Sequence, residues 1–461
     1  MNNNRTRREF LKQCALYGAL GTTSSFTSLG TLSSTVLAAT RPVGYRAMVC
    51  VYLEGGNDCN MLVKDTDEDY AAYMEQRGSR ALNRDDILQI ESGSENYGIH
   101  PAMTGAKQLY DQNKLSFIAN VGALKEPTTA ASYQARSVDL PPKLFSHITQ
   151  KNFIRSGLPF EGERRTGWAG RIADRYDDDN SWTAQIPMNL SASGTTNVWQ
   201  EGTKTKPFGY GGRILPIFGY RDDVASQRKR REALLALYDH DYNNAFLNEY
   251  GNSFKTSIER GDFVREATKS TVITLTTAFP ATRVGQGLKN IADLINSRVS
   301  LGVANTQQAF YFHMGGFDTH NDLAGRHSSN LKQLSDALLA FNSALEEMGL
   351  ADDVLTFTNS DFGRTSVGNQ SGSDHGWGGH QLVMGGQNLI NGGQVFGTYP
   401  LFSGDDPQYI ANSRGILVPS TSHNQMSATI AKWYGGFTDN ELDELLPNLS
   451  NFSVKDLGFV K

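Results

Sequence analysis

Short apolar runs alternate with amphipathic stretches along much of the chain. Residues 45–54 form the first run, which stops at Gly55-Gly56 and has the length and continuity of a buried parallel strand. Four later runs have the same character: 115–121, 308–313, 354–358 and 381–384. Alternation of such strands with helical segments predicts an α/β fold with a mostly parallel central sheet.

A long helix is expected between residues 324 and 348. Its apolar positions recur at three- and four-residue steps, as a face packed on a sheet requires; they are Leu331, Leu334, Leu338, Phe341, Leu345 and Met348. Shorter helices are expected at 101–113, from Ser146 to Arg155, at 424–435 and at 439–446. Each has the length of an ordinary helix of a globular protein.

Residues 160–300 have a different pattern from the rest. The part up to about residue 225 is rich in Gly, Thr and aromatic residues without a stable period, and residues 223–300 are largely helical with charged faces. A chain of 461 residues allows two or three domains, or one large core with insertions. We expect one domain over residues 40–461 with a loop-rich and helical insertion at about 160–300.

The composition is that of a globular protein, with 39% hydrophobic and 20% charged residues. This balance excludes a disordered, collagen-like or coiled-coil protein. The formal net charge is −5, and without residues 1–39, which carry +3, the remainder carries −8. A protein of this charge has no overall field that attracts nucleic acid or anionic membranes, so an anionic substrate would need local cations.

The first 39 residues have the features of an export signal. Arg7-Arg8 is followed by Glu9-Phe10-Leu11-Lys12, a weakly apolar stretch and small residues up to Ala38 and Ala39. This order is typical of a twin-arginine signal peptide. A membrane helix would need about 20 strongly apolar residues, and this stretch has too many Gly, Ser and Thr. We therefore expect passage through the twin-arginine translocase, a periplasmic or secreted protein, and no transmembrane segment after cleavage.

Three cysteines are present, and Cys14 leaves with the signal. Cys50 lies in the first predicted strand and Cys59 just beyond its end. Mostly extended chain between them would hold their Cα atoms too far apart for a disulfide, unless the loop folds back. We expect two free thiols.

Acidic and imidazole side chains gather in the loops that follow the later strands. Five histidines lie within 68 residues: His313, His320, His327, His375 and His380. Asp318 and His320 follow one strand, Asp361 follows the next, and His375 and His380 precede a third. Because the carboxyl ends of parallel strands meet at one edge of a sheet, these clusters are expected to converge.

Such a set of ligands favours a divalent metal, of which zinc, manganese and iron are the candidates, with one or two ions. A single histidine is more often a turn cap or a satisfied core residue, but Asp318, His320, Asp361, His375 and His380 together favour a metal site. Asp58 ends the first strand in Gly55-Gly56-Asn57-Asp58 and reaches the same edge. An Asn-Asp turn without further function explains Asp58 equally well.

Ser146 and His147 stand at the start of the predicted helix that runs to Arg155. A helix N-terminus stabilises an anion, which suits a covalent intermediate on Ser146. A plain helix cap accounts for Ser146 as well. Arg364, between Gly363 and Thr365, is a candidate to hold anionic oxygens in a bidentate manner.

Several motifs resemble the exported proteins of domain-of-unknown-function family 1501. They are GGNDxxN, LFSHxxQ, GW-x-GR at Gly167–Arg171, GGFDTH, the SDFGRT run and DHGWGGH, in that order over about residues 45–435. The resemblance implies an alkaline-phosphatase-like α/β/α sandwich of the sulfatase and phosphatase superfamily, with a binuclear metal site. In this reading the ligand and nucleophile places fall on Asp58, Ser146, Asp318, His320, Asp361, His375 and His380.

The chain departs from that superfamily in two places. Asp318 and His320 are only two residues apart, and Asp361 is followed by Phe362 where histidine is common, so one metal can be missing. There is no Cys-x-Pro-x-Arg stretch, which makes a formylglycine sulfatase improbable.

These observations lead to two functional hypotheses. The first is an exported metal-dependent hydrolase of phosphate or sulfate esters, in which Ser146 or a metal-activated water attacks an anionic ester. The second is a catalytically degenerate relative that acts as a periplasmic binding or assembly factor for cell-surface material. Metal content separates the two, since a binding module need not keep a stoichiometric divalent ion.

Overall fold

The computed structural model describes residues 42–159, 166–179, 181–195, 197–212, 214, 219–221, 223–404 and 408–461. The twin-arginine segment, with Arg7-Arg8 and Ala38, lies outside these residues and stays a prediction. Within the described ranges, no helix combines the length and apolar character that crossing a membrane requires.

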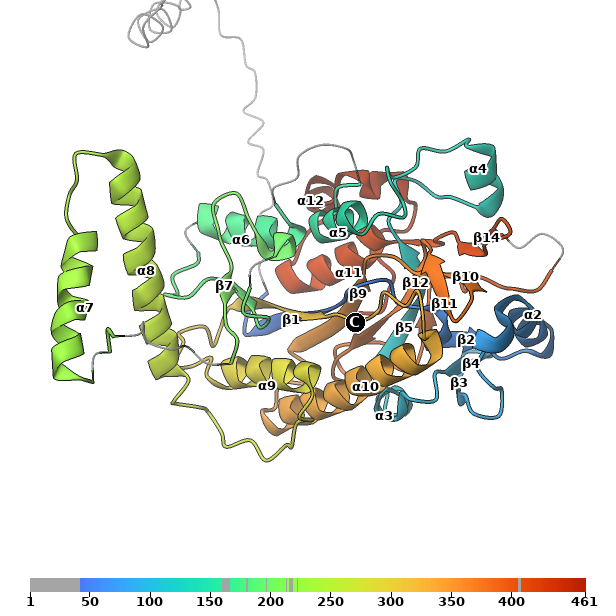
Figure 1. Ribbon diagram of the computed structural model, residues 1–461, viewed down its shortest axis with the longest axis horizontal. Helices are drawn as coiled ribbons and strands as arrows, with labels where there is room; N and C mark the ends of the chain where they lie inside the picture. The colour runs from blue at the N-terminus through green and yellow to red at the C-terminus, as the bar shows by residue number, and fades with distance from the viewer. Residues whose placement is uncertain are drawn as a thin grey trace, which may run out of the picture. The chain divides into compact units, whose positions relative to one another are not determined.

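A nine-stranded sheet forms the centre of the fold (Figure 1). Strand β1 (Arg46–Leu53) pairs in parallel with β8 (Gln307–Met314) on one side and β9 (Val354–Ser360) on the other. Beyond β9, β12 (Gly379–Met384) runs antiparallel to both β9 and β5 (Leu115–Gly122). The short strands β13 (Val395–Phe396), β16 (Thr421–Ser422), β6 (Asn189–Ser191) and β7 (Phe208–Gly209) complete it. The sheet is thus mostly parallel, as predicted.

Strand β1 is buried on both faces because it lies in the middle of the sheet. Val49, Val51 and Leu53 belong to one hydrophobic core, whereas Cys50 and Tyr52 belong to the other. The two-residue period of a strand sends alternate side chains to opposite faces, so a continuous apolar run fits this position. Cys50 and Cys59 are both buried and free, as expected.

Helices cover both faces of the sheet (Figure 1). One layer contains α3 (Thr104–Asp111), α9 (Arg283–Asn296) and α10 (Leu323–Glu347). The opposite layer contains α5 (His147–Ser156), α6 (Trp168–Asp178), α11 (His423–Gly435) and α12 (Asp439–Leu445). The arrangement is the α/β/α sandwich that the sequence predicts.

Much of the region between residues 160 and 300 belongs to these layers. Helices α6 and α9 pack on the two faces, and β6 pairs in parallel with β8, so the central sheet extends into the stretch that we expected to be an insertion. Helices α7 (Ala225–Tyr238) and α8 (Ala245–Ala267) contact each other, and the described side chains of α7 are not buried. That helix pair is the part that resembles an addition to the core.

Smaller elements surround the main layers. An antiparallel sheet has the order β2 (Leu62–Lys64), β4 (Glu95–Ile99) and β3 (Leu88–Ser92). Two antiparallel pairs are β10 (Arg364–Asn369) with β11 (Gly372–His375), and β14 (Ile410–Ala411) with β15 (Ile416–Leu417). The remaining α-helices are α2 (Asp67–Arg77) and α4 (Ala130–Ala135), and 3-10 turns occupy Cys59–Met61, Gly78–Arg80, Val198–Gln200 and Pro447–Asn451.

Candidate metal centre

The carboxyl ends of three adjacent parallel strands bring the predicted residues to one edge of the sheet. Asp318 follows β8 and Asp361 follows β9, and both strands flank β1. The β10–β11 pair carries Arg364 opposite His375. His147 arrives from another layer, at the first position of α5. The convergence predicted for strand-end loops is therefore present.

Three imidazole rings surround the carboxylate of Asp318. Its Oδ2 lies 3.5 Å from Nε2 of His147, and its Oδ1 lies 3.3 Å from Nε2 of His320 and 3.5 Å from Nε2 of His375. The Nε2 atoms of His320 and His375 are 3.0 Å apart. His147, Asp318 and His375 each offer a ligand atom within 4.8 Å of the others, and within the described ranges this is the single group of that kind.

Each of these rings has an oxygen behind its Nδ1 atom. His147 Nδ1 is 2.6 Å from Oδ2 of Asp361, and His375 Nδ1 is 2.8 Å from the carbonyl oxygen of Phe145. His320 Nδ1 is 3.4 Å from Oδ1 of Asp374. An Nδ1–H that donates to such an oxygen leaves the lone pair on Nε2, which is how proteins orient histidine ligands toward a metal.

The geometry fits a bound cation. Two Nε2 lone pairs that face each other at 3.0 Å repel, unless a proton or a cation lies between them. Imidazole nitrogen together with one carboxylate is the donor set that suits zinc, iron or manganese. Asp318 and His320 remain about half exposed, at 47% and 46%, so solvent and a ligand reach the centre.

Arg364 has a different role from the one expected. Its side chain is fully buried, and its guanidinium donates to the carbonyl oxygens of Gly55 and Ser373 and, at 2.7 Å, to Oδ1 of Asp318. These donors are therefore not available to clamp substrate oxygens. Burial acts to raise the pKa of Asp318, but the hydrogen bond and charge of Arg364 outweigh it and hold the pKa below its ordinary value. Arg364 positions and ionises Asp318.

Asp58 does not join the centre. It forms an ion pair with Arg77, Nη2 to Oδ1 at 2.7 Å, and both side chains are fully buried. Oδ1 also accepts from the backbone N–H of Asn60 at 2.9 Å. Burial acts to raise the pKa of Asp58, yet the charge of Arg77 holds it below its ordinary value. The protein supplies its own cation to this carboxylate, which corrects the prediction that Asp58 is a metal ligand.

His380 is also separate from the centre. Its Nδ1 accepts from the backbone N–H of Asn120 at 3.3 Å, and its ring stacks on Tyr399 with centroids 5.3 Å apart. Burial lowers the pKa of His380 to about 4, so the ring is neutral at ordinary pH. The reason for the error is that His380 lies inside β12, whose residues are all buried, rather than in the loop before it.

Asp361 contacts the centre through His147 instead of entering the ligand group. One of its oxygens faces Nδ1 of that ring, and Nζ of Lys151 lies 3.9 Å from the same oxygen. Among the described residues, its buried Oδ1 has no hydrogen-bond partner. Asp361 therefore orients the ring of His147 and does not itself belong to the group around Asp318.

Ser146 occupies the N-cap position of α5 without capping it. Its side chain makes no hydrogen bond to the backbone of the helix, and its oxygen accepts from the hydroxyl of Thr149 at 3.4 Å. Both neighbours in the chain take part in the centre, since the carbonyl of Phe145 binds His375 and His147 faces Asp318. Of the two interpretations left open for Ser146, the plain cap is not the one observed.

Three further residues around the centre were not singled out from the sequence. Asp374 supports His320, and Lys151 bonds Glu54, which ends β1 and also bonds His313. Signals for them existed. Asp374 directly precedes His375 in the sequence. Lys151 is four residues after His147, and this spacing places His147 and Lys151 on one face of a helix.

One part of the chain matches the model of a known protein family. Residues 303–419 match the family described as "Protein of unknown function (DUF1501)". This match agrees with the resemblance that the motifs indicated. The matched stretch contains GGFDTH, SDFGRT and DHGWGGH, and therefore Asp318, His320, Asp361 and His375. None of the curated proteins compared with the chain matches it.

Solved structures with some similarity to the chain include hydrolases. The PsFucS1 sulfatase from Pseudoalteromonas sp. is 11% identical, with 91% of this chain and 73% of that one covered and a TM-score of 0.35. The lipoteichoic acid synthase LtaP from Listeria monocytogenes is 8% identical, with 86% and 72% covered and a TM-score of 0.31. A mutant of the alkaline phosphatase PafA is 12% identical, with 69% and 63% covered and a TM-score of 0.26. At these scores, the function has to be argued from the centre's own geometry.

Proposed function

We propose that this protein is an exported, metal-dependent hydrolase of phosphate or sulfate esters. The observation that carries the proposal is the convergence of three Nε2 atoms on Asp318, with an oxygen behind the Nδ1 atom of each ring. A proton between His320 and His375 would relieve the repulsion of one pair of Nε2 atoms, whereas a metal ion would accept lone pairs from all three rings and from Asp318.

In this proposal, the residues of the centre either hold the metal ion or orient the residues that hold it. His147, Asp318 and His375 hold one zinc, manganese or iron ion, with His320 beside them. When bound, the ion polarises the ester oxygen and neutralises negative charge that develops there. Arg364 keeps Asp318 ionised and oriented, and Asp361 keeps the Nδ1 proton on His147.

The nucleophile that we propose is the hydroxyl of Ser146. It lies at the N-terminus of α5, where free backbone N–H groups and the helix dipole stabilise an anion. It is also not engaged in capping the helix, so its oxygen is free to approach an ester. A water molecule that attacks directly is the alternative, and Ser146→Ala separates the two because only covalent attack needs this hydroxyl.

Metal content and turnover of the purified protein test the proposal. We expect about one ion per chain by elemental analysis, and hydrolysis of 4-nitrophenyl phosphate or 4-nitrophenyl sulfate that a chelator abolishes. Asp318→Asn should lose the ion and the activity, because the amide keeps an acceptor for Arg364 but lacks the ligand charge. Asp322→Asn is the matched control, since Asp322 is an exposed carboxylate in the following turn. Loss of metal in that variant, or its retention in Asp318→Asn, would contradict the assignment.

One observation favours the second candidate function, a binding or assembly factor for cell-surface material. Asp58 and His380, two ligands that the two-ion site of the resembled superfamily implied, are sequestered in the protein interior. A centre with one ion can bind an anion without cleaving it. A metal-loaded protein that binds phosphate or sulfate esters and turns over none of a broad panel would establish this function instead.

The proposed export route depends on the N-terminal pattern. Replacement of Arg7 and Arg8 by lysine should leave the precursor in the cytoplasm, because the twin-arginine translocase reads this pair. Immunoblots of periplasmic and cytoplasmic fractions give the answer. Export of the wild-type protein in cells without an active twin-arginine translocase would exclude the route.

A further inference from the structure

A pocket of about 580 Å³ lies beside the segment that leads into α5. Its lining combines aromatic rings, aliphatic side chains, two amides and two cations, and includes Tyr133, Arg136, Leu140, Lys143, Phe145 and Asn412. Mixed walls of this kind are typical of pockets for organic ligands, in which a few polar groups fix the orientation.

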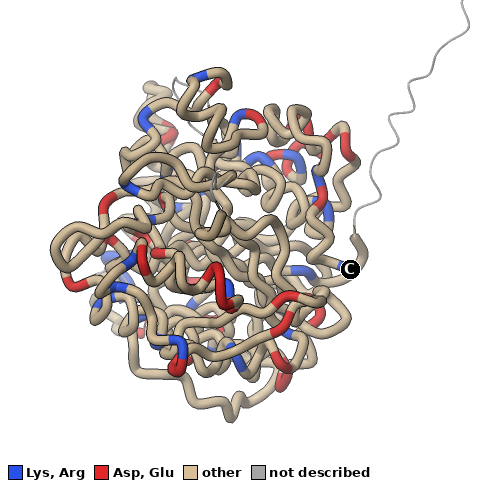
Figure 2. Tube along the Cα trace, turned by 90° about the vertical axis from the view of Figure 1, so that its right-hand side faces the viewer, with Lys and Arg blue, Asp and Glu red and all other residues tan. Residues whose placement is uncertain are grey.

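The pocket carries two cations, Arg136 and Lys143. Arg136 and Lys143 are exposed, and neither side chain has an ion-pair or hydrogen-bond partner among the residues that the structure describes. Elsewhere lysines and arginines lie intermixed with acidic residues (Figure 2), and many form ion pairs. Two unpaired cations in one concave surface attract an anion.

Both cations also stand on unusual backbone. Six non-glycine residues of the described chain have a positive φ, and three of them, Arg136, Lys143 and Asn412, line this pocket. At Arg136 this conformation is that of the C-cap of α4, and at Lys143 it belongs to a turn in which the backbone N–H of Ser146 donates to the carbonyl oxygen of Lys143. The cap and the turn fix the backbone positions from which Arg136 and Lys143 line the pocket.

Two connections join the pocket to the metal centre. Phe145 lines the pocket, and its carbonyl oxygen accepts from Nδ1 of His375. Arg414, two residues after Asn412, has its guanidinium 6.0 Å from the ring of Phe145 and 3.5 Å from Asp374, which supports His320. The pocket is therefore next to the centre, on the side of these two histidines.

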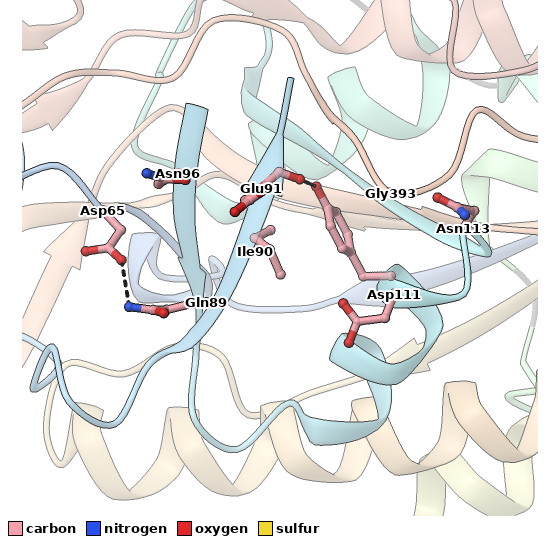
Figure 3. Close-up of a pocket in the computed structure, with 9 residues that line it drawn as sticks. Asp65, Gln89, Ile90, Glu91, Asn96, Asp111, Asn113 and Gly393 are labelled. Atoms are coloured by element: carbon pink, nitrogen blue, oxygen red, sulfur yellow. Dashed lines mark hydrogen bonds between the residues drawn. The ribbon is translucent and has the colours of Figure 1, made fainter. Parts of the chain in front are cut away.

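A second pocket, of about 620 Å³ near β3 and α3, shows the contrast (Figure 3). Two of its three acidic groups have partners, since Asp65 bonds Gln89 and Arg84 while Asp111 pairs with Lys107. The hydroxyl of Tyr110 donates to the carbonyl oxygen of Glu91. The charged residues that line that pocket are acidic, whereas those that line the pocket beside α5 are Arg136 and Lys143.

The geometry points to a substrate subsite that binds an anionic saccharide attached to the scissile ester. The C–H surface of a sugar can pack against the aromatic rings of Tyr133 and Phe145. The ring of Tyr133 also contacts that of Trp377, with the two centroids 5.6 Å apart. Arg136 and Lys143 pair with a carboxylate or sulfate on that sugar. The inference rests on the proposed hydrolase function, and it deepens that function by naming the substrate class.

Calorimetric titration of the purified full chain tests the subsite without any turnover. The probes are trigalacturonate, which carries carboxylates, and neutral maltotriose. We expect the charged probe to bind more tightly, and Arg136→Asn/Lys143→Asn to weaken it about tenfold or more, with binding of maltotriose unchanged. Lys332→Gln, on the exposed face of α10, is the control and should change neither probe.

Three outcomes would overturn the subsite: no binding of trigalacturonate to the wild-type chain, equal binding by the double variant, or tighter binding of the aryl anion benzoate than of trigalacturonate. Folding of the variant is checked by its thermal midpoint, which should equal or exceed that of the wild type because asparagine tolerates φ near 50°. The KM for 4-nitrophenyl phosphate should not change, because that small ester does not reach the pocket. If the wild-type protein binds trigalacturonate but hydrolyses nothing, the proposed reaction fails while the subsite stands.

Discussion

Two carboxylate–histidine groups lie near the same edge of the sheet, and they have opposite chemistry. Asp318 is half exposed and faces three Nε2 atoms. Asp58 is fully buried, pairs with Arg77, and lies near His327 and His380. Both aspartates were predicted as metal ligands from equivalent positions after strands.

The two aspartates differ in how completely the protein buries the carboxylate. Asp58 has a guanidinium in a closed environment, and burial lowers the pKa of His327 to about 3 and that of His380 to about 4, so these rings stay neutral. Asp318 also accepts from Arg364, but only at Oδ1, while Oδ2 faces His147. Asp318 stays available to an external cation because about half of its side chain is exposed beside its pair with Arg364, whereas both side chains of the Asp58–Arg77 pair are fully buried.

Removal of Arg77 is expected to have the largest effect. Arg77→Met leaves Asp58 as a buried charge without its partner, and we expect the free energy of unfolding to fall by about 3–5 kcal/mol. Urea denaturation measures it. Lys332→Met, which removes the lysine of a largely exposed pair with Asp336, should cost less than about 1 kcal/mol. Equal losses in the two variants would remove the distinction between an enclosed and an exposed ion pair.

The second-largest effect is expected from acid, which should lower the free energy of unfolding through the buried histidines near Asp58, His327 and His380. The unfolded chain binds protons at histidines near pH 6.5, whereas folded His380 and His327 bind them only near pH 4 and 3. Stability is therefore fully present above pH 6.5 and is lost as the pH falls from 6.5 toward 4, by up to about 1.4 kcal/mol per pH unit for each ring. Urea denaturation between pH 7 and pH 4 should show a shallower loss for His380→Gln. The same slope in both proteins would mean that His380 titrates normally when folded.

A change near the group around Asp318 is expected to alter its affinity for a metal ion. Asp361→Asn removes the charge behind Nδ1 of His147, and we expect about 10- to 100-fold weaker metal binding with little change in fold. Competition with a fluorescent chelator measures the affinity, and Asp322→Asn again serves as control. Unchanged affinity would exclude His147 as a ligand.

The smallest effect is expected at Asp374. Its contact with Nδ1 of His320 is longer, at 3.4 Å, and its side chain is 43% exposed, so solvent screens it. Asp374→Asn should weaken metal binding less than about tenfold in the same competition assay. A larger loss than for Asp361→Asn would make His320 rather than His147 the dominant ligand.

Local pattern was enough for the elements of the core. The continuous apolar run of β1 and the three- and four-residue steps of α10 appear where the sequence placed them. These patterns are readable because burial on one or both faces repeats with the period of the strand or helix. The strands β6 and β7 were missed, since segments of two or three residues carry no period.

The sequence by itself determined which residues could bind a metal, since Asp318, His320 and His375 lie in glycine-rich loops after or before strands, next to a family signature. Only the tertiary structure decided which of the candidates are available. Arg77 of α2 forms the ion pair with Asp58, and His380 is buried because it belongs to β12. His147, at the start of α5, contacts Asp318 and completes the group around it. The physical reason is that ligand chemistry belongs to a side chain, whereas the charge and solvent around that side chain come from residues distant in the sequence.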